Sequence, residues 1–168
     1  MLYKFTGADG SSTNGGWGRW HLGRWRTVSG PLLPCRRGLH MCREKDLVLW
    51  LAPALWEAEV DGEVIEADDK VVARKARIVR RVEAWDDRTA RLFAADCAEH
   101  VLPLFEAALP GDARPRTAIE TARRFANGEV TDEERAAARA AERAAAWDAA
   151  GAAEREWQTA RLMAYLAG

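Results

Sequence analysis

One segment constrains the fold of this chain more than any other. In it, Trp56, Ala58 and Val60 alternate with glutamates, which is the period-2 pattern of a half-buried strand. The pair Asp61-Gly62 follows and suits the positive φ angles of a two-residue hairpin turn. A return strand and then a long basic strand over 70–83 complete the pattern. We therefore expect an antiparallel meander of three strands here.

After residue 85 the pattern changes to helical periodicity. Asp86 or Asp87 can cap a helix whose apolar residues form one stripe at spacings of three and four. Pro115 opens a second helix, and Asn127-Gly128 closes it. Thr131 begins a capping box that starts a long alanine-rich helix. We expect the helices to form a bundle; alternatively, the last helix is offered to a partner or to a second copy of the chain.

Together these patterns predict an α+β fold. A small antiparallel β-sheet domain, residues 1–85, is expected to pack against a C-terminal helical region of about three helices, residues 86–168. Four further features are expected in the first domain: a strand over 2–5, a turn-rich loop over 7–18, a strand over 20–28 and a short helix over 44–51.

Composition and net charge indicate which compartment and which kinds of partner suit this chain. The 168 residues carry a formal net charge of −1, so no global charge draws the chain to nucleic acid or to an anionic membrane. No apolar stretch approaches the roughly 20 residues that cross a bilayer, and the first residues lack the apolar core of a signal peptide. Three cysteines, an odd number, fit reduced thiols. We expect a cytoplasmic protein with no membrane contact.

Charge is unevenly distributed along the first half. Residues 1–45 contain eight Lys or Arg and two Asp or Glu, whereas residues 51–70 contain seven Asp or Glu and one Lys. We expect the two segments to neutralise each other across neighbouring strands.

The basic segment interleaves arginine with tryptophan, and the chain has eight tryptophans in all. Such interleaving occurs where bases stack and phosphates bind, in cation–π ladders on a sheet surface, and at protein interfaces. We favour a surface that binds a protein partner, with nucleic acid as an alternative. The predicted partner-binding residues are Trp17, Arg19, Trp20, Arg24, Trp25, Arg26, Arg36 and Arg37.

The stretch CRRGLHMC places Cys35, His40 and Cys42 within eight residues. Zinc takes about four such ligands, and His21, Cys97 or His100 is a candidate fourth. The absence of a C-x2-C pair argues against this weak alternative, so no metal and no cofactor is predicted. The other interpretations are that the cysteines are buried as small apolar groups, or that His40 serves a ligand or catalysis.

Glu57 and Glu59 lie two apart on one strand face. An E-x-E on a strand resembles the glutamate motif of mono-ADP-ribosyltransferases, which implies an upstream Arg or His, a role open to His40, and a further Ser-Thr-Ser or Tyr element that this chain lacks. The alternative function is therefore an ADP-ribosyltransferase-like or small-ligand-binding enzyme using His40, Glu57 and Glu59. A solvated strand face is the simpler interpretation. With no P-loop, GxGxxG, HExxH or GxSxG motif, we predict a non-enzymatic protein.

The two halves each carry a family resemblance. The order Cys35, Gly38, His40, Cys42, then a short helix and the hairpin EVDGE, resembles an uncharacterised family of actinobacterial and phage-encoded hypothetical proteins. The second half, from FAADCAEHVLPLFE to the alanine- and tryptophan-rich tail, resembles the helical region of immunity proteins. The resemblance implies a small accessory protein of phage or mobile-element origin. Its partner would be a host-defence component or a toxin, and its C-terminal helix is a candidate for oligomer contacts.

Overall fold

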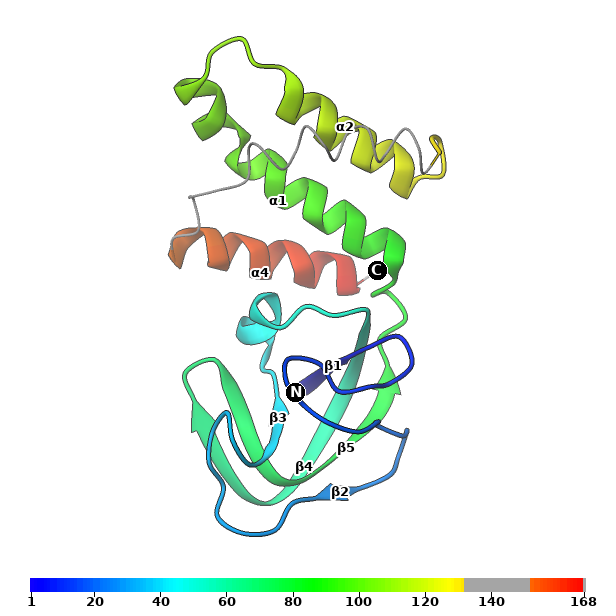
Figure 1. Cartoon of the computed structure of the whole chain (residues 1–168), viewed down its shortest axis with the longest axis vertical. Coiled ribbons are helices and arrows are strands. Elements are labelled where there is room, and N and C mark those ends of the chain that lie inside the picture. The colour runs from blue at the N-terminus through cyan, green and yellow to red at the C-terminus, as the bar shows by residue number, and fades with distance from the viewer. Residues whose placement is uncertain (132–151, 168) are drawn as a thin grey trace. The chain divides into compact units, whose positions relative to one another are not determined.

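The computed structural model describes residues 1–131 and 152–167. It confirms the α+β class: an antiparallel sheet is built from the first half of the chain and helices from the second (Figure 1). The chain divides into two compact units, Met1–Trp85 with Leu162–Gly168, and Asp86–Arg161. We call them the sheet unit and the helical unit. The predicted domain ranges remain predictions.

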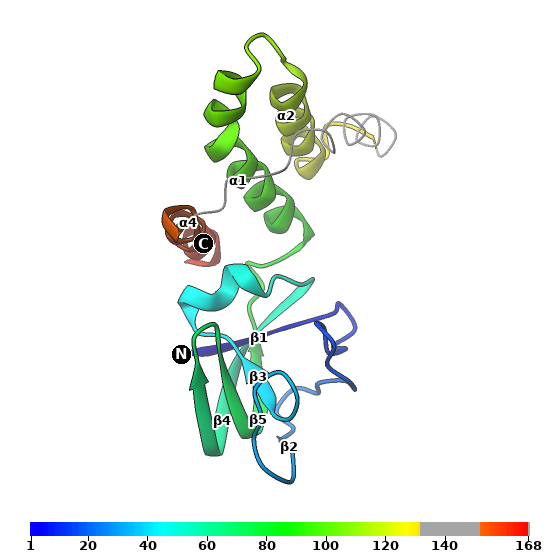
Figure 2. The ribbon, with the colours of Figure 1, turned by 60° about the vertical axis from the view of Figure 1, so that its left-hand side comes forward.

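The sheet has five strands, two of them long. The strands are β1 (Leu2–Thr6), β2 (Arg26–Thr27), β3 (Leu39–Met41), β4 (Ala54–Ala67) and β5 (Lys70–Arg81). All pairings are antiparallel in the order β1-β4-β5-β2, and β3 also pairs with β5 (Figure 2). β2 and β3 follow each other along the same edge of β5, because β2 faces Lys75 and Ala76 whereas β3 faces Val71 to Ala73.

Backbone pairing in the sheet unit runs in a closed ring. The N–H groups of Tyr3 and Cys42 each donate to the other's carbonyl oxygen at 2.8 Å. This bridge joins β1 to the residue that follows β3, so the pairing passes from β1 through β4, β5 and β3 back to β1. The stretch CRRGLHMC is therefore part of the sheet, and its end contacts the first strand.

The hairpin turn predicted at Asp61-Gly62 is wrong. β4 continues through it, and its register changes from Asp61 opposite Lys75 to Val64 opposite Ala73, so β4 holds one residue more than β5. This is a β-bulge, and a glycine at φ +76° suits it. The chain turns instead between Ala67 and Lys70, within the predicted turn over 67–69. The predicted three-strand meander is thus two long strands.

One further local prediction needs correction, and another is made more specific by the structure. Only Arg26–Thr27 of the predicted strand 20–28 is a strand; the preceding residues form turns, which the N–H of Gly23 ties to Ile78 O at 2.8 Å. The short helix expected over 44–51 is a 3-10 helix, η1 (Glu44–Leu49).

The core of the sheet unit includes buried side chains from several strands. Leu39 and Met41 of β3 project into it beside Ile78 of β5, and Trp20 joins them from the long connection between β1 and β2. β5 is buried on both faces over Val71–Ala73.

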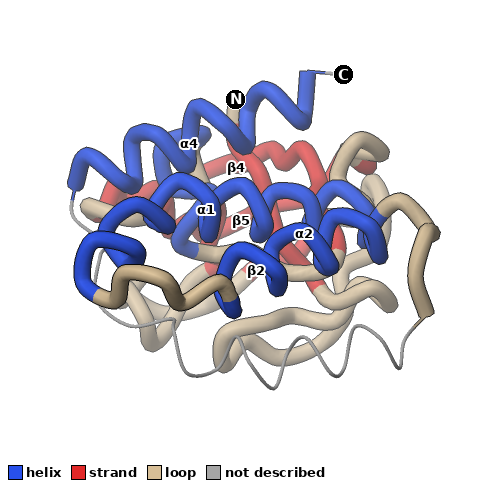
Figure 3. The backbone as a smooth tube through the Cα atoms, turned by 90° about the horizontal axis from the view of Figure 1, so that it is seen from above, coloured by secondary structure: helices blue, strands red, loops and turns tan. Residues whose placement is uncertain are grey.

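The described part of the helical unit consists of α1 (Asp87–Ala108), α2 (Arg114–Ala126) and the first residues of α4 (Ala152–Ala167). Asp86 caps α1, since its carboxylate accepts the N–H of Thr89 at 2.7 Å. α1 continues through Pro103. α1 and α2 pack side by side (Figure 3), with Leu102 and Ile119 at their contact. Thr131 is described, but the rest of the predicted capping box and the helix expected after it, up to residue 151, lie outside the described residues.

A buried carboxylate joins the three helices that the structure describes in this unit. Asp96 of α1 accepts hydrogen bonds from Arg123 of α2 at 2.6 Å and from Arg161 of α4 at 2.7 Å. His100 stacks on Trp157 with ring centroids 3.9 Å apart. Over the residues that the structure describes, none of the helices is long and apolar enough to cross a membrane.

Candidate functional site

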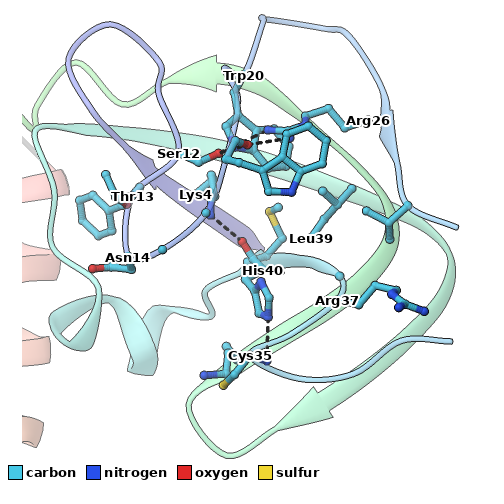
Figure 4. A pocket seen from close by; sticks show the side chains of 18 of the residues that line it. Lys4, Ser12, Thr13, Asn14, Trp20, Arg26, Cys35, Arg37, Leu39 and His40 are labelled. Carbon is cyan, nitrogen blue, oxygen red and sulfur yellow. Dashed lines mark hydrogen bonds between the residues drawn. The ribbon is translucent and has the colours of Figure 1, made fainter. Parts of the chain in front are cut away.

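The sheet unit contains a cavity of about 590 Å³. Its walls come from the loop over 12–17, from β2 and the residues after it, and from the stretch 35–42 (Figure 4). Lys4 and Phe5 of β1, Lys70 of β5, and the side chains of Trp20 and Trp50 also line it. The cavity therefore unites the two stretches that the sequence marked, the tryptophan–arginine run and CRRGLHMC.

Ser12 fixes the loop that forms one wall. Its hydroxyl donates to Trp17 O at 3.1 Å and accepts Nε1 of Trp20 at 3.1 Å and Nη1 of Arg26 at 3.4 Å. Arg26 Nη2 also donates to Trp17 O at 3.0 Å. One hydroxyl thus links the loop to the core tryptophan and to the start of β2, which holds the loop against the cavity.

His40 lies on β3 with its side chain at the cavity, whereas the flanking Leu39 and Met41 are buried. Its Nε2 accepts the backbone N–H of Cys35 at 3.2 Å, and its carbonyl oxygen accepts Lys4 Nζ at 3.0 Å (Figure 4). Burial lowers the pKa of His40, and the charges of Lys4 and Lys70 lower it further. The ring is therefore neutral at physiological pH, with Nε2 as acceptor and the proton on Nδ1.

The two cysteines of this stretch differ in chemistry. Cys35 is exposed at φ +64°, whereas Cys42 is buried, and burial raises the pKa of its thiol to about 12. Within residues 1–131 and 152–167, no group of three or more His, Cys, Asp or Glu is arranged to hold a metal ion. Cys97 and His100, two candidate fourth ligands, belong to the helical unit.

The charged side chains that line the cavity are all cationic among the described residues. Five lysine or arginine side chains border it, and no Asp or Glu does among the described residues. Burial removes water from the charged groups of Lys4 and Arg26 and so lowers the pKa of each. Arg26 lies over the rings of Trp20 and Trp17, at 4.6 and 5.5 Å from their centroids. The arrangement favours a negatively charged occupant.

The acidic segment, residues 51–70, is neutralised mainly by β5 and not, as expected, by the basic segment, residues 1–45. The acidic residues of β4 pair mainly with β5, through Glu57–Arg80, Glu59–Arg77, Asp61–Lys75 and Glu63–Arg74. From the basic segment, Arg43 reaches Glu66 and Asp46, and Arg19 pairs with Asp9. Of the five cations at the cavity, Lys70 pairs with Asp69 at 3.1 Å, and the other four form no ion pair with a described residue.

The predicted partner-binding residues fall into two groups. Trp17, Trp20, Arg26, Arg36 and Arg37 line the cavity, whereas Arg19, Arg24 and Trp25 do not. Within the first group, Trp17 is 80% exposed and Trp20 is 5% exposed. In the second group, Trp25 lies beneath Lys75 and Arg77, both 4.6 Å from its ring centroid. The eight residues are therefore not one continuous surface.

The structure does not bring the proposed enzyme residues together. Glu57 and Glu59 are absent from the lining of the cavity. Arg80 Nε donates to Glu57 at 2.9 Å and Arg77 Nη2 to Glu59 at 2.6 Å, so both carboxylates are engaged on the strand face. His40 faces the cavity without them.

Sequence reasoning missed several side chains of the site, among them Lys4, Lys70 and Trp50. Lys70 Nζ lies 4.6 Å from the ring centroid of Trp50. A lysine between apolar residues in a strand, as in LYKF, is a signal that could have identified Lys4, because an inward-facing lysine is rarely buried without a reason. Lys70 follows a turn and gives no such signal.

Two family models match the chain. Residues 1–89 match a domain of unknown function (DUF7666), and residues 80–164 match the Imm-5 like putative immunity protein family. Neither the curated proteins nor the solved structures gave a match. These results confirm an uncharacterised domain in the first half and an immunity-like region in the second. The chain therefore belongs to the DUF7666 family through its sheet-forming half and to the Imm-5 like putative immunity protein family through its helical half.

Proposed function

We propose that this chain is an immunity-type protein of phage or mobile-element origin that acts without catalysis, by binding a protein partner such as a toxin or a host-defence component. The match to the Imm-5 like family over 80–164 supports this proposal. If the chain acts by binding a protein partner, the helical unit should present a surface suited to another protein.

An exposed apolar end of α1 is the observation that carries the proposal. Leu104 is 63% exposed and Leu109 is 51% exposed, and the residues between and beside them that are also exposed are Pro103, Ala107, Ala108 and Pro110. Apolar groups gathered in this way on a protein surface mark interaction sites.

Charged pairs border this apolar end. Arg116 pairs with Glu106 at 2.6 Å and Arg114 with Asp112 at 2.5 Å. An apolar centre with a polar rim is the usual anatomy of a protein interface. The partner is therefore expected to offer an apolar patch of its own, and the ion pairs at the rim leave little net charge to attract nucleic acid.

The test co-expresses this chain with the product of each neighbouring gene that proves toxic to cells, and measures protection as colony counts. The Leu104→Glu/Leu109→Glu variant should lose protection, because two carboxylates would be buried at the interface without partners. The control is Leu22→Glu/Leu49→Glu, two leucines of the sheet unit that are 63% and 48% exposed. Circular dichroism should show both variants folded.

Equal protection by the two double variants would refute the assignment of the surface. A lack of protection by the unmodified chain, in cells that express it at a high level, would refute immunity against that product. Native mass spectrometry of the variants also tests self-association: a dimer that Leu104→Glu/Leu109→Glu dissolves would assign this end of α1 to a second copy instead.

A further inference from the structure

We propose that the cavity of the sheet unit binds a nucleoside phosphate, with its phosphate at the cations of the cavity and its base on Trp17. The inference concerns a different unit from the partner surface on α1 and does not depend on it. It is argued from charge, from the exposed aromatic ring and from the size of the cavity.

The charge argument rests on which cations are compensated. Lys4, Arg26, Arg36 and Arg37 line the cavity, and none of them forms an ion pair with a residue in the described part of the chain. Lys70 pairs with Asp69 at 3.1 Å. Four uncompensated positive charges around one hollow repel each other, and a bound phosphate would relieve that repulsion.

Arg36 and Arg37 are suited to hold the phosphate. Both side chains are exposed, and no hydrogen bond engages either guanidinium within the described residues. Guanidinium groups bind phosphate with two parallel hydrogen bonds. Figure 4 shows the Arg37 side chain on the wall that also carries Cys35 and His40, and the neutral ring of His40 leaves its Nδ1–H as one more donor to an anion.

Trp17 is suited to hold a base. It is 80% exposed although it lines the cavity, and Arg26 lies 5.5 Å from its ring centroid. An exposed indole backed by a guanidinium is a stacking platform for a flat aromatic group. Gly15 and Gly16, next to it in the loop, have no side chains to fill the space.

The size of the cavity and the charge pattern around it favour a small ligand over a strand. About 590 Å³ lies within the range of roughly 300–1,000 Å³ that small-molecule sites occupy. A strand would need a track of cations beyond the cavity, yet most basic residues there are paired with carboxylates of β4. Arg24 and Lys45 are the exposed cations outside the cavity that make no ion pair among the described residues of the sheet unit.

Isothermal titration calorimetry of the full chain at low salt tests the proposal, with AMP, GMP and CMP as probes. One nucleotide should bind per chain, and adenosine and inorganic phosphate should each bind at least about tenfold more weakly, because each offers half of the contacts. Arg36→Gln/Arg37→Gln should weaken AMP binding by about tenfold or more. Arg24→Gln/Lys45→Gln removes the same charge outside the cavity and should leave AMP affinity unchanged.

Trp17→Ala tests the contact with the base separately from the contact with the phosphate. It should weaken AMP binding by about tenfold, from the loss of stacking, and leave inorganic phosphate binding unchanged. Alkylation gives an independent readout: bound AMP should slow the reaction of Cys35, which lines the cavity, with neutral iodoacetamide.

Three results would overturn the proposal. The first is no binding of any of the three nucleotides at millimolar concentration. The second is an equal loss of AMP affinity in the two double variants. The third is tighter binding of a ten-nucleotide single strand than of AMP, with a steep salt dependence and a loss in Arg24→Gln/Lys45→Gln, which would assign the surface to nucleic acid.

Discussion

Gly38 gives the sharpest test of how CRRGLHMC is packed. Its φ is +152°, and a methyl group built on it would lie 2.2 Å from Cγ1 of Val72, a side chain of β5 that is fully buried. Carbon atoms pack at about 3.5–4.0 Å, so in Gly38→Ala either β3 or β5 must move. Backbone strain costs about 1–3 kcal/mol, and overpacking costs about 1–3 kcal/mol. The expected loss in the free energy of unfolding is therefore about 2–6 kcal/mol.

Gly23→Ala is the matched control. Gly23 also has a positive φ, +70°, but a methyl group there would meet nothing within 4 Å. Only the backbone penalty applies, about 1 kcal/mol after the gain from a stiffer unfolded chain. Urea denaturation measures both variants, and amide hydrogen exchange in β5 reports on the sheet unit by itself.

A double-mutant cycle isolates the clash. Val72→Ala removes the methyl group that Gly38→Ala would strike, so the two substitutions together should cost at least about 1 kcal/mol less than the sum of the single losses. If Gly38→Ala costs no more than Gly23→Ala, or if the cycle is additive, the close packing of this stretch on β5 is refuted.

Three further predictions concern single side chains. Trp20→Ala should lower the free energy of unfolding by about 3–5 kcal/mol in urea denaturation, because Trp20 is buried in the sheet-unit core; a loss below about 1 kcal/mol would contradict that burial. Asp86→Ala should cost about 1 kcal/mol at pH 7. The backbone hydrogen bond at the start of α1 lowers the pKa of Asp86, so this contribution disappears as the pH falls below about 4, and a loss that is independent of pH would argue against capping. With iodoacetamide, followed by mass spectrometry, exposed Cys35 should react first, since burial raises the pKa of Cys42 to about 12 and of Cys97 to about 11; equal rates would contradict the burial of those two thiols.

Local sequence patterns predicted the elements whose main contacts are made by residues close together in the chain. The strand at 2–5 and the opening of the second helix near Pro115 correspond to β1 and α2. The cap at Asp86 follows from its carboxylate and the next turn of backbone. In each case the residues that define the element also make its main contacts.

Pairing between distant strands explains what the sequence could not show. Asp61-Gly62 fits a hairpin turn and a bulge equally well, and only its pairing with β5 decides between them. The stretch Leu39–Met41 becomes a strand because β5 offers it an edge. Three residues are too few for a periodic pattern to predict.

The local sequence pattern also could not predict which tryptophans of the tryptophan–arginine run are buried. Trp17 and Trp20 are three residues apart in similar surroundings along the chain, yet one is exposed and the other belongs to the core. The difference comes from the bend at Gly18, whose φ is +75°, and from Ser12, whose hydroxyl accepts a hydrogen bond from Nε1 of Trp20. A substitution at Trp20 therefore reports on stability, whereas one at Trp17 reports on binding.

The charge pattern of the first half links the fold to the proposed site. The sequence shows a basic segment before an acidic one, and simple neutralisation between them would leave no charge for function. Instead β5, itself basic, compensates β4 through four ion pairs. The bulge at Gly62 keeps Asp61 and Glu63 paired with β5 despite the extra residue. Because β4 is already compensated, Lys4, Arg26, Arg36 and Arg37 of the first segment form no ion pair with a described residue, and the closed ring of strands brings these four cations together around one cavity.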